Sequence, residues 1–563
     1  MANNLRMQRR VTAFAGLVLL AAFYVGFAFG RGRLWDYDFW WHLKTGMLIV
    51  QQHAIPHTDP FSWTRPGAPW TAHEWGWDAL LYLVYRLGGF LGLIYLKAAL
   101  FGGCAVLATY LALRWGAGLL PALAVTVLLS AAVAVWLNAR PQMLIVLYVL
   151  LILHVLTSHR EGRPRALWWL PVIFLFWANT HGAFLIGWAL LVLYGVCEVL
   201  QPSRVAQASK PASDLPAEGD LEIDAAPAAG AGITPVADAG LEACATPGGG
   251  LRCGWPLPSL RGLLPLLLPG IASVLICLAN PNGVQGALYP FSYVFGANAY
   301  HAQIITEYAS PDFHQAIFVM MEALMLVTVL AMIISPEAPS LWELALLLSG
   351  IYLFLKWARN GPILAVFCVP LAARHLTARL RCSRWLAWLG EQELELRPAM
   401  AALGAVVILL ALALLAPHDP SPTGTIDAGL LPLRATQVVQ LNPPQGNLFN
   451  SYEWGGYLIW ELYPQYKVFI DGRADMYGSD LVDEYEKIFR LQSGWQDALK
   501  KRKIEWLLVH ADGTLAEILE EGTDYAVLYR DDTAVLFARR GGVNQRLIDE
   551  AKAGKLKMPP EEK

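Results

Sequence analysis

Two carboxylates stand close together near the start of the chain, among aromatic side chains. Residues 34–43 have the sequence Leu-Trp-Asp-Tyr-Asp-Phe-Trp-Trp-His-Leu, which places Asp36 and Asp38 among three tryptophans and just before His42. In a partly dry pocket a carboxylate can act as a general base or as a metal ligand. The alternative is an aromatic belt at a membrane surface, in which the two aspartates only face water.

The composition indicates that these carboxylates lie beside a membrane. Of the 563 residues, 56% are hydrophobic and only 15% are charged, whereas soluble proteins average about 25% charged residues. The formal net charge is −3 and no extended basic patch is present, so a nucleic-acid partner is not expected. The apolar stretch 11–29 is long enough to span a bilayer, and we interpret it as a retained first helix rather than a cleaved signal peptide.

Eleven apolar stretches of spanning length, some of them short, predict a polytopic α-helical membrane protein. They are residues 11–29, 90–113, 119–137, 143–156, 167–178, 184–200, 263–279, 317–334, 341–355, 363–373 and 400–416. The stretch 74–87 is also apolar, but a helix on the membrane surface there keeps the basic loop 158–165 inside, as the positive-inside rule prefers. We therefore expect a bacterial-type plasma membrane protein with a cytoplasmic N-terminus and an extracytoplasmic C-terminus.

The chain is expected to have four parts. Residues 1–200 form a first transmembrane module with a long outer loop at 30–89, and residues 263–416 form a second module. Between them, 201–262 is a cytoplasmic linker rich in Ala, Pro and Gly, which cannot bury a core of its own. Residues 417–563 have the alternation and the helical periods of a small α/β domain. Its expected strands are 466–470, 506–510 and 534–538, and its expected helices are 480–491 and 494–502.

Few cationic or imidazole side chains fall on the predicted outer face. Arg140 lies between the third and fourth helices, His181 between the fifth and sixth, and Lys356 and Arg359 between the ninth and tenth. Such groups can stabilise the charge of a phosphate. The alternative is that the basic side chains extend from helix ends to water and that His181 only caps a turn.

Three motifs, in this order along the chain, resemble the GT-C superfamily of integral-membrane glycosyltransferases, and within it the oligosaccharyltransferase branch. They are Asp38-Phe-Trp-Trp-His42, Ile304-Ile-Thr-Glu307 and Glu453-Trp-Gly-Gly-Tyr-Leu458. The resemblance implies a GT-C-like bundle and an enzyme that takes a sugar from a polyprenyl-phosphate or polyprenyl-pyrophosphate carrier. The second outer loop, Asn138-Ala-Arg-Pro-Gln142, lacks the acidic metal-binding pair of that branch, so the metal-free lipid-linked sugar transferases are an equal model.

The residues and the resemblance together predict roles. Asp38, helped or replaced by Asp36, activates the acceptor as general base, and direct displacement inverts the anomeric carbon. Arg140 and Arg359, with Lys356 and His181, bind the departing lipid phosphate. The resemblance also implies a divalent cation, Mg²⁺ or Mn²⁺, held by Asp38 and Glu307. The residues expected to contact the acceptor are Glu307, His42, Trp454, Asp471 and Arg473.

Other interpretations fit part of the pattern. A lipid or solute transporter is built on similar bundles, but transporters usually have inverted repeats and charges near the midplane. A catalytically silent subunit of a membrane complex fits the missing acidic pair in 138–142. For Asp471 and Arg473, an Asp-Gly turn with an internal ion pair is the alternative to an acceptor contact.

Overall fold

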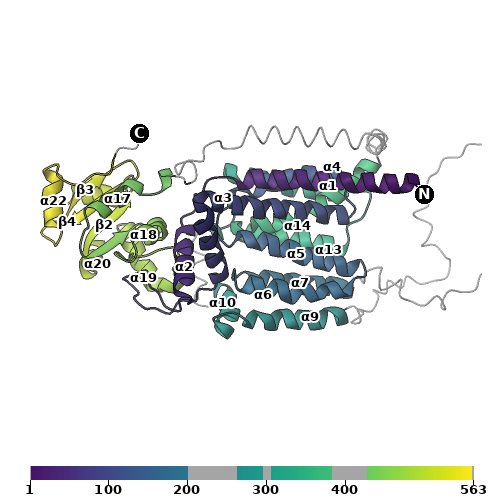
Figure 1. Ribbon diagram of the computed structural model, residues 1–563, viewed down its shortest axis with the longest axis horizontal. Helices are drawn as coiled ribbons and strands as arrows, with labels where there is room; N and C mark the ends of the chain where they lie inside the picture. Colours follow the sequence, from purple (N-terminus) through teal and green to yellow (C-terminus); the bar gives the residue numbers. More distant parts are fainter. Residues whose placement is uncertain (1, 201–262, 296–305, 383–425, 427, 561–563) are drawn as a thin grey trace, which may run out of the picture.

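The computed structural model describes residues 2–200, 263–295, 306–382, 426 and 428–560. Figure 1 shows helices running side by side in an elongated bundle, with a smaller domain that contains the sheet at one end. The helix α1 (Ala2–Gly30) begins at the opposite end of the bundle. The linker 201–262, the predicted span 400–416 and the first two residues of the motif at 304–307 lie outside the described residues.

The other ten predicted spans all fall on helices. Besides α1, the bundle helices are α3 (Trp75–Arg114), α4 (Leu119–Val133), α5 (Met143–Arg160), α6 (Trp169–Ala178), α7 (Phe184–Leu200), α9 (Leu264–Leu275), α12 (Val319–Ile334), α13 (Leu341–Lys356) and α14 (Gly361–Arg381). Within the described ranges, five helical segments are long and apolar enough to cross a bilayer, or six if one bent pair counts as a span. The predicted count of eleven spans is therefore not confirmed.

The helix α14 lies at the centre of the bundle. It packs against α3, α4, α12 and α13, and 15 of its 21 residues are buried. Residues 361–373 of this helix carry no charged side chain, and a helical segment that is apolar on every side has to be enclosed by protein or lipid. On the outside of the bundle, large apolar side chains such as Leu268, Ile333 and Leu348 are exposed, which suits contact with lipid tails.

Two helical segments cross the end of the bundle that faces the sheet domain. One is α2 (Phe39–Gln52), and Figure 1 shows it between the bundle and the domain. The other is the first part of α3, which breaks from the spanning part at Gly89, where φ is 58° and ψ is −154°. This left-handed backbone favours glycine, and the break separates the predicted surface helix 74–87 from the span. Because α2 begins at Phe39, Asp38 is its N-cap residue.

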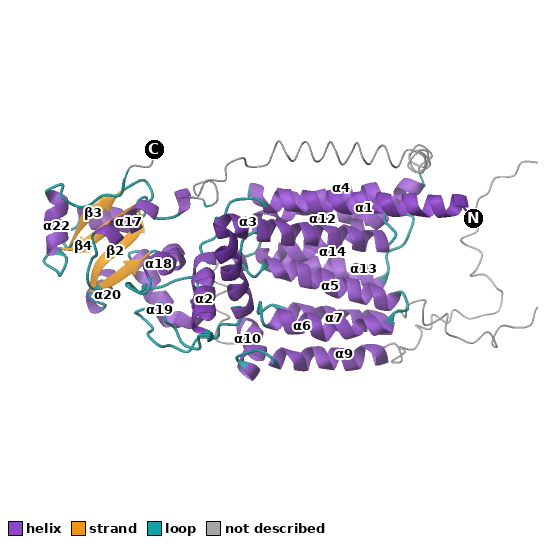
Figure 2. Cartoon of the chain, in the orientation of Figure 1, coloured by secondary structure: helices purple, strands orange, loops and turns teal. Residues whose placement is uncertain are grey.

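The C-terminal domain is built on a four-stranded mixed sheet, drawn in orange in Figure 2. The strand order is β1 (Asn447–Asn450), β2 (Ile504–His510), β4 (Ala534–Arg539) and β3 (Tyr525–Arg530), with β1 parallel to β2 and the other pairs antiparallel. The predicted strands 506–510 and 534–538 are confirmed within β2 and β4. The helices around the sheet are α17 (Leu433–Leu441), α18 (Gly455–Leu462), α19 (Ala474–Phe489), α20 (Trp495–Lys501), α21 (Thr514–Glu521) and α22 (Gln545–Lys552).

The predicted strand 466–470 is wrong. In the structure Val468 makes only an isolated bridge to Ser62, with the Val468 N–H donating to the Phe61 carbonyl at 3.0 Å and the Trp63 N–H donating to the Val468 carbonyl at 3.1 Å. The segment has no ladder pairing with a strand, although the Phe469 and Tyr466 rings pack on Phe449 of β1 and Trp506 of β2. The bridge to Ser62 matters because it fixes the next residues, 471–473, against the first outer loop.

Candidate functional site

Three carboxylates surround the guanidinium of Arg140. Its Nη2 atom lies 2.6 Å from Asp38 Oδ2, and its Nη1 atom lies 3.2 Å from both Asp36 Oδ2 and Glu307 Oε1. The carboxylates come from the first outer loop and from the short helix Thr306–Tyr308, and Arg140 comes from the loop between α4 and α5. The structure therefore brings together four of the residues that the sequence singled out.

The two aspartates have different surroundings. Asp36 Oδ1 accepts the backbone N–H of Asp38 at 2.8 Å, and Asp36 Oδ2 accepts the Asn138 amide at 3.0 Å. The Asp36 side chain is only 7% exposed, whereas that of Asp38 is 21% exposed. Asp36 is thus held by several hydrogen bonds and hidden, while Asp38 keeps an accessible edge. Of the two, Asp38 is better placed to receive a proton.

The charges around Asp38 also suit a base. Burial raises the pKa of Asp38 to about 6, and the Asp36 and Glu307 carboxylates raise it further against the opposing effect of Arg140. A general base works best when its pKa lies near the working pH. Burial alone would also raise the pKa of Glu307, but the Arg140 and Arg359 guanidiniums lower it below its ordinary value.

The C-terminal domain covers the Asp38 carboxylate with backbone. A Cβ atom added at Gly472 would overlap Asp38 Oδ1 and would lie 3.2 Å from Trp41 Nε1. Only a glycine allows the chain to approach this closely. This residue's role could not be predicted, because the contact joins positions more than 400 residues apart.

We expect that Gly472→Ala lowers the sugar-transfer activity predicted from the sequence about 100-fold, because the new methyl group must push Asp38 or the domain out of position. Turnover of the purified variant with a lipid-linked sugar measures the effect. Gly88→Ala is the matched control, since a Cβ at Gly88 meets open space. Equal rates for Gly472→Ala and the parent would contradict the assignment of this contact to the site.

The predicted acceptor residues of the C-terminal domain are buried in structural contacts. Arg473 pairs with Asp471 at 2.7 Å and with Asp59 at 2.8 Å, and its guanidinium lies 4.6 Å from the centre of the Trp70 ring. The internal ion pair, the alternative for these two residues, is therefore present. Trp454 is also buried, with its indole N–H donating to the Leu430 carbonyl at 3.0 Å.

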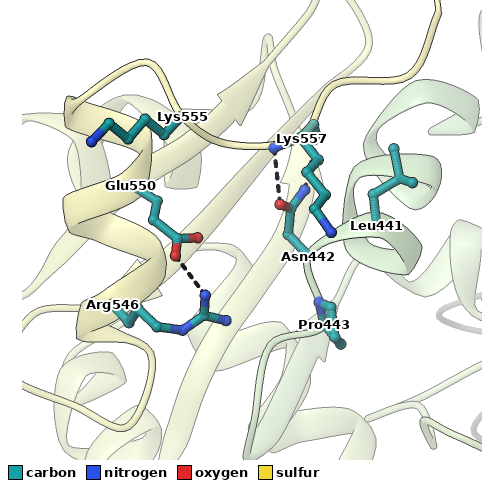
Figure 3. A pocket seen from close by; sticks show the side chains of 7 residues that line it. All are labelled: Leu441, Asn442, Pro443, Arg546, Glu550, Lys555 and Lys557. Atoms are coloured by element: carbon teal, nitrogen blue, oxygen red, sulfur yellow. Dashed lines mark hydrogen bonds and ion pairs between the residues drawn. The ribbon is translucent and has the colours of Figure 1, made fainter.

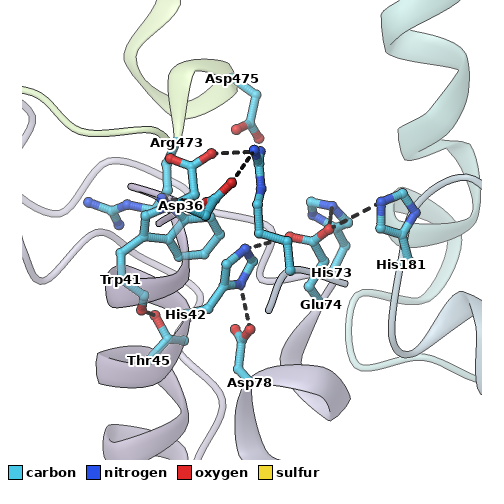
Figure 4. A network of polar contacts seen from close by, with 12 residues as sticks. Asp36, Trp41, His42, Thr45, His73, Glu74, Asp78, His181, Arg473 and Asp475 are labelled. Carbon is cyan, nitrogen blue, oxygen red and sulfur yellow. Dashed lines mark hydrogen bonds and ion pairs between the residues drawn. The ribbon is translucent and has the colours of Figure 1, made fainter. Parts of the chain in front are cut away.

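A second polar cluster surrounds Glu74, which the sequence did not single out. The Nε2 atoms of His42, His73 and His181 lie 3.7, 3.5 and 3.6 Å from its carboxylate oxygens, and His42 Nδ1 lies 2.7 Å from Asp78 Oδ1 (Figure 4). Burial lowers the pKa of His42 and of His181 to about 3. Burial alone would lower the pKa of His73 too, but Glu74 raises it. His42 and His181 thus belong to this cluster.

Arg359 and Lys356 pack on aromatic rings. The Arg359 guanidinium lies 4.4 Å from the centre of the Tyr308 ring, and Lys356 Nζ lies 4.6 Å from the centre of the Trp357 ring. In the described part of the chain neither cation has a carboxylate within 4 Å, in contrast to Arg140. Arg359 is close enough to Glu307 to lower the pKa of that carboxyl. Its charge is therefore available beside the Arg140 cluster.

The donor set does not fit the expected divalent cation. Across the described ranges, no group of three His, Cys, Asp or Glu side chains is arranged to hold a metal ion. Between Asp38 and Glu307, where the cation was expected, the Arg140 guanidinium contacts both carboxylates. In this structure a guanidinium therefore stands where the cation was predicted.

A separate hollow of about 260 Å³ lies on the C-terminal domain (Figure 3). Its lining includes Arg546, Lys555 and Lys557, but Arg546 is paired with Glu550 at 2.5 Å. It lies beside α22 and the end of α17, and no residue of the two clusters lines it. It is not part of the candidate site.

Comparison with known proteins supports the expected fold. The sequence matches no family model and no curated protein significantly. Among solved structures, the oligosaccharyltransferase AglB from Archaeoglobus fulgidus, in complex with an inhibitory peptide and a dolichol-phosphate, is similar with a TM-score of 0.52 and 11% identity over 94% of this chain and 75% of that chain. ArnT from Cupriavidus metallidurans, bound to undecaprenyl phosphate, has a TM-score of 0.44 and 13% identity over 94% of this chain and 98% of that chain. The AglB match shows that this chain shares the overall fold of that structure, which is the fold that the motif resemblance implies.

Proposed function

We propose that the protein is a glycosyltransferase that moves a sugar from a polyprenyl-phosphate or polyprenyl-pyrophosphate carrier to an acceptor at the outer face of a bacterial-type plasma membrane. The observation that carries the proposal is Asp38, a partly exposed carboxylate with a raised pKa beside cationic side chains at one end of a GT-C bundle. In the proposed topology the N-terminus is cytoplasmic and the C-terminal domain is extracytoplasmic. Membrane lipids surround the bundle, and other subunits of a membrane complex are possible partners.

In the proposed reaction Asp38 removes a proton from the nucleophile of the acceptor. The nucleophile then attacks the anomeric carbon, the bond from that carbon to the phosphate oxygen breaks, and the lipid phosphate leaves with the bonding electrons. Direct displacement of this kind inverts the anomeric carbon. Asp36 keeps the loop in place through its bonds to Asn138 and to the backbone of Asp38, rather than taking the proton itself.

Charge balance favours Arg359, with Lys356, as the contact for the departing phosphate. The single positive charge of Arg140 already faces three carboxylates, so that cluster is negative overall when all three are ionised and does not attract a phosphate. Arg359 has no such partner among the described side chains and is held in place by the Tyr308 ring. A guanidinium matches the geometry of phosphate oxygens well.

Accordingly, Arg359→Gln is expected to weaken the binding of undecaprenyl phosphate by about 10- to 100-fold, since a hydrogen bond to a charged group contributes roughly 1.5–3 kcal/mol. Titration of the lipid into the full-length protein in nanodiscs measures the dissociation constant. Arg546→Gln, in the remote hollow of the C-terminal domain, is the control. Unchanged binding in Arg359→Gln would rule out this role.

The experiment that tests the proposed function measures the cleavage of the lipid-linked sugar donor. The full-length protein in nanodiscs is incubated with polyprenyl-linked sugars and with membrane glycans or proteins as acceptors, and released polyprenyl phosphate is measured by mass spectrometry. The parent should release the lipid from at least one donor, and Asp38→Asn should release it at least about 100-fold more slowly. Equal release by both proteins would rule out Asp38 as the base. No release by either protein with any donor would favour a silent subunit.

A further inference from the structure

The Arg140 cluster consists of three carboxylates that converge on one positive charge. Asp36 and Asp38 come from the loop after α1, and Glu307 comes from a segment more than 260 residues further along the chain. All three side chains contact one cation, and carboxylates are also the ligands that Ca²⁺ and Mg²⁺ prefer. Here the cation is a guanidinium, with contacts of 2.6, 3.2 and 3.2 Å.

We infer that Arg140 does the work of a divalent cation in this site, holding Asp36, Asp38 and Glu307 together so that sugar transfer needs no metal ion. That Arg140 holds the three carboxylates together concerns binding alone. That sugar transfer needs no metal ion rests on the proposed function. Arg140 is a positioning residue in this scheme, because it acts through Asp38. An arginine remains charged at every physiological pH, so a chelator cannot remove this centre.

A metal ion and the guanidinium exclude each other. Divalent cations bind carboxylate oxygens at about 2.0–2.6 Å, and the same oxygens already lie 2.6–3.2 Å from the Arg140 nitrogens. A bound ion would stand almost in contact with a second positive charge. Without either centre, three carboxylates would repel one another in a partly buried site.

The loop that carries Arg140 is fixed independently of the ion pairs. Ala139 is buried, and Asn138 donates to Asp36 at 3.0 Å. Pro141 restricts the backbone of the residue before it, and the Arg140 carbonyl accepts the N–H of Met143 at the start of α5 at 3.3 Å. These contacts of the turn therefore hold the guanidinium beside the carboxylates.

Mn²⁺ binding to the full-length protein in nanodiscs, measured by electron paramagnetic resonance, tests the inference without any activity assay. The parent should have no Mn²⁺ site that depends on Glu307, and Arg140→Met should bind Mn²⁺ at least about tenfold more tightly, because it frees three carboxylate ligands. Arg140→Lys keeps the charge and should gain nothing. Arg33→Met is the control for removing an exposed arginine from the same loop as Asp36.

Two results would overturn the inference. One is Mn²⁺ binding by the parent that is abolished in Glu307→Gln. This measurement needs no Arg140 variant, so it remains informative if Arg140→Met does not fold. The other is sugar transfer by the parent that EDTA stops and Mn²⁺ restores. If no transfer occurs under any condition, the proposed function fails, while the Mn²⁺ measurements still decide what occupies the cluster.

Discussion

Asp38→Asn is expected to reduce sugar transfer about 10²- to 10⁴-fold, the usual contribution of a positioned general base. The asparagine keeps the shape of the side chain but cannot accept a proton from the acceptor. Loss of the Asp38 carboxylate should change turnover much more than donor binding, because Arg359 rather than Asp38 is assigned to the phosphate. Initial rates of polyprenyl-phosphate release, together with titration of undecaprenyl phosphate, separate the two effects.

Asp36→Asn is the matched variant, since the two residues lie in one loop and both contact Arg140. The rate of sugar transfer by Asp36→Asn should fall only about tenfold, because an asparagine can still accept one of the hydrogen bonds that Asp36 receives. If Asp36→Asn loses more activity than Asp38→Asn, the proton goes to Asp36 instead. If both variants match the parent, the protein is not a transferase that uses these carboxylates.

The pH profile gives the Asp38 assignment an independent check within the same variants. Because the pKa of Asp38 is raised to about 6, this carboxyl is protonated below that pH and cannot act as a base. The rate of the parent should therefore rise with pH up to about 6 and then level off. The residual activity of Asp38→Asn should lack this rise, and a rise that persists in the variant would have another cause.

Much of the site could be predicted from the sequence because it lies where helices end. The positions of Asp36, Asp38, Arg140 and Glu307 in loops between apolar stretches place them at one end of the bundle, where they can come together. Which of these side chains pair with one another could not be predicted, since the pairing depends on how three loops that are distant in sequence come together. For the same reason Arg140 was expected to hold a phosphate, and the structure places it among carboxylates.

The Glu74 cluster and the role of Gly472 could not be predicted from the sequence either, because their contacts also join distant parts of the chain. His73 and Glu74 stand in a tryptophan-rich segment without a recognisable motif, and their partners His42 and His181 are far away in sequence. Apolar stretches are easier to predict, because the length of a span is set by the bilayer. The predicted strand 466–470 is wrong because an apolar segment can be buried without pairing to a strand, and Val468, Phe469 and Ile470 are buried in succession.

The second large expected effect concerns the joint between the first outer loop and the C-terminal domain. Arg473 lies there with a side chain only 1% exposed, between the Asp59 and Asp471 carboxylates and against the Phe61 and Trp70 rings. Arg473→Met is expected to destabilise the protein by about 3–5 kcal/mol, because two buried carboxylates lose their counter-charge. Thermal unfolding of the purified protein in detergent, followed by intrinsic tryptophan fluorescence, measures the loss.

The same substitution should also impair the site, although Arg473 touches neither the donor nor Asp38. Gly472 precedes it and covers the Asp38 carboxylate, so a loosened joint moves that cover away from the base. Arg546→Met removes an exposed arginine from the same domain and should leave both unfolding temperature and transfer unchanged. If Arg473→Met unfolds like the parent, the buried ion pairs do not hold the domain to the loop. If it is destabilised yet transfers sugar normally at low temperature, the domain is not needed to position Asp38.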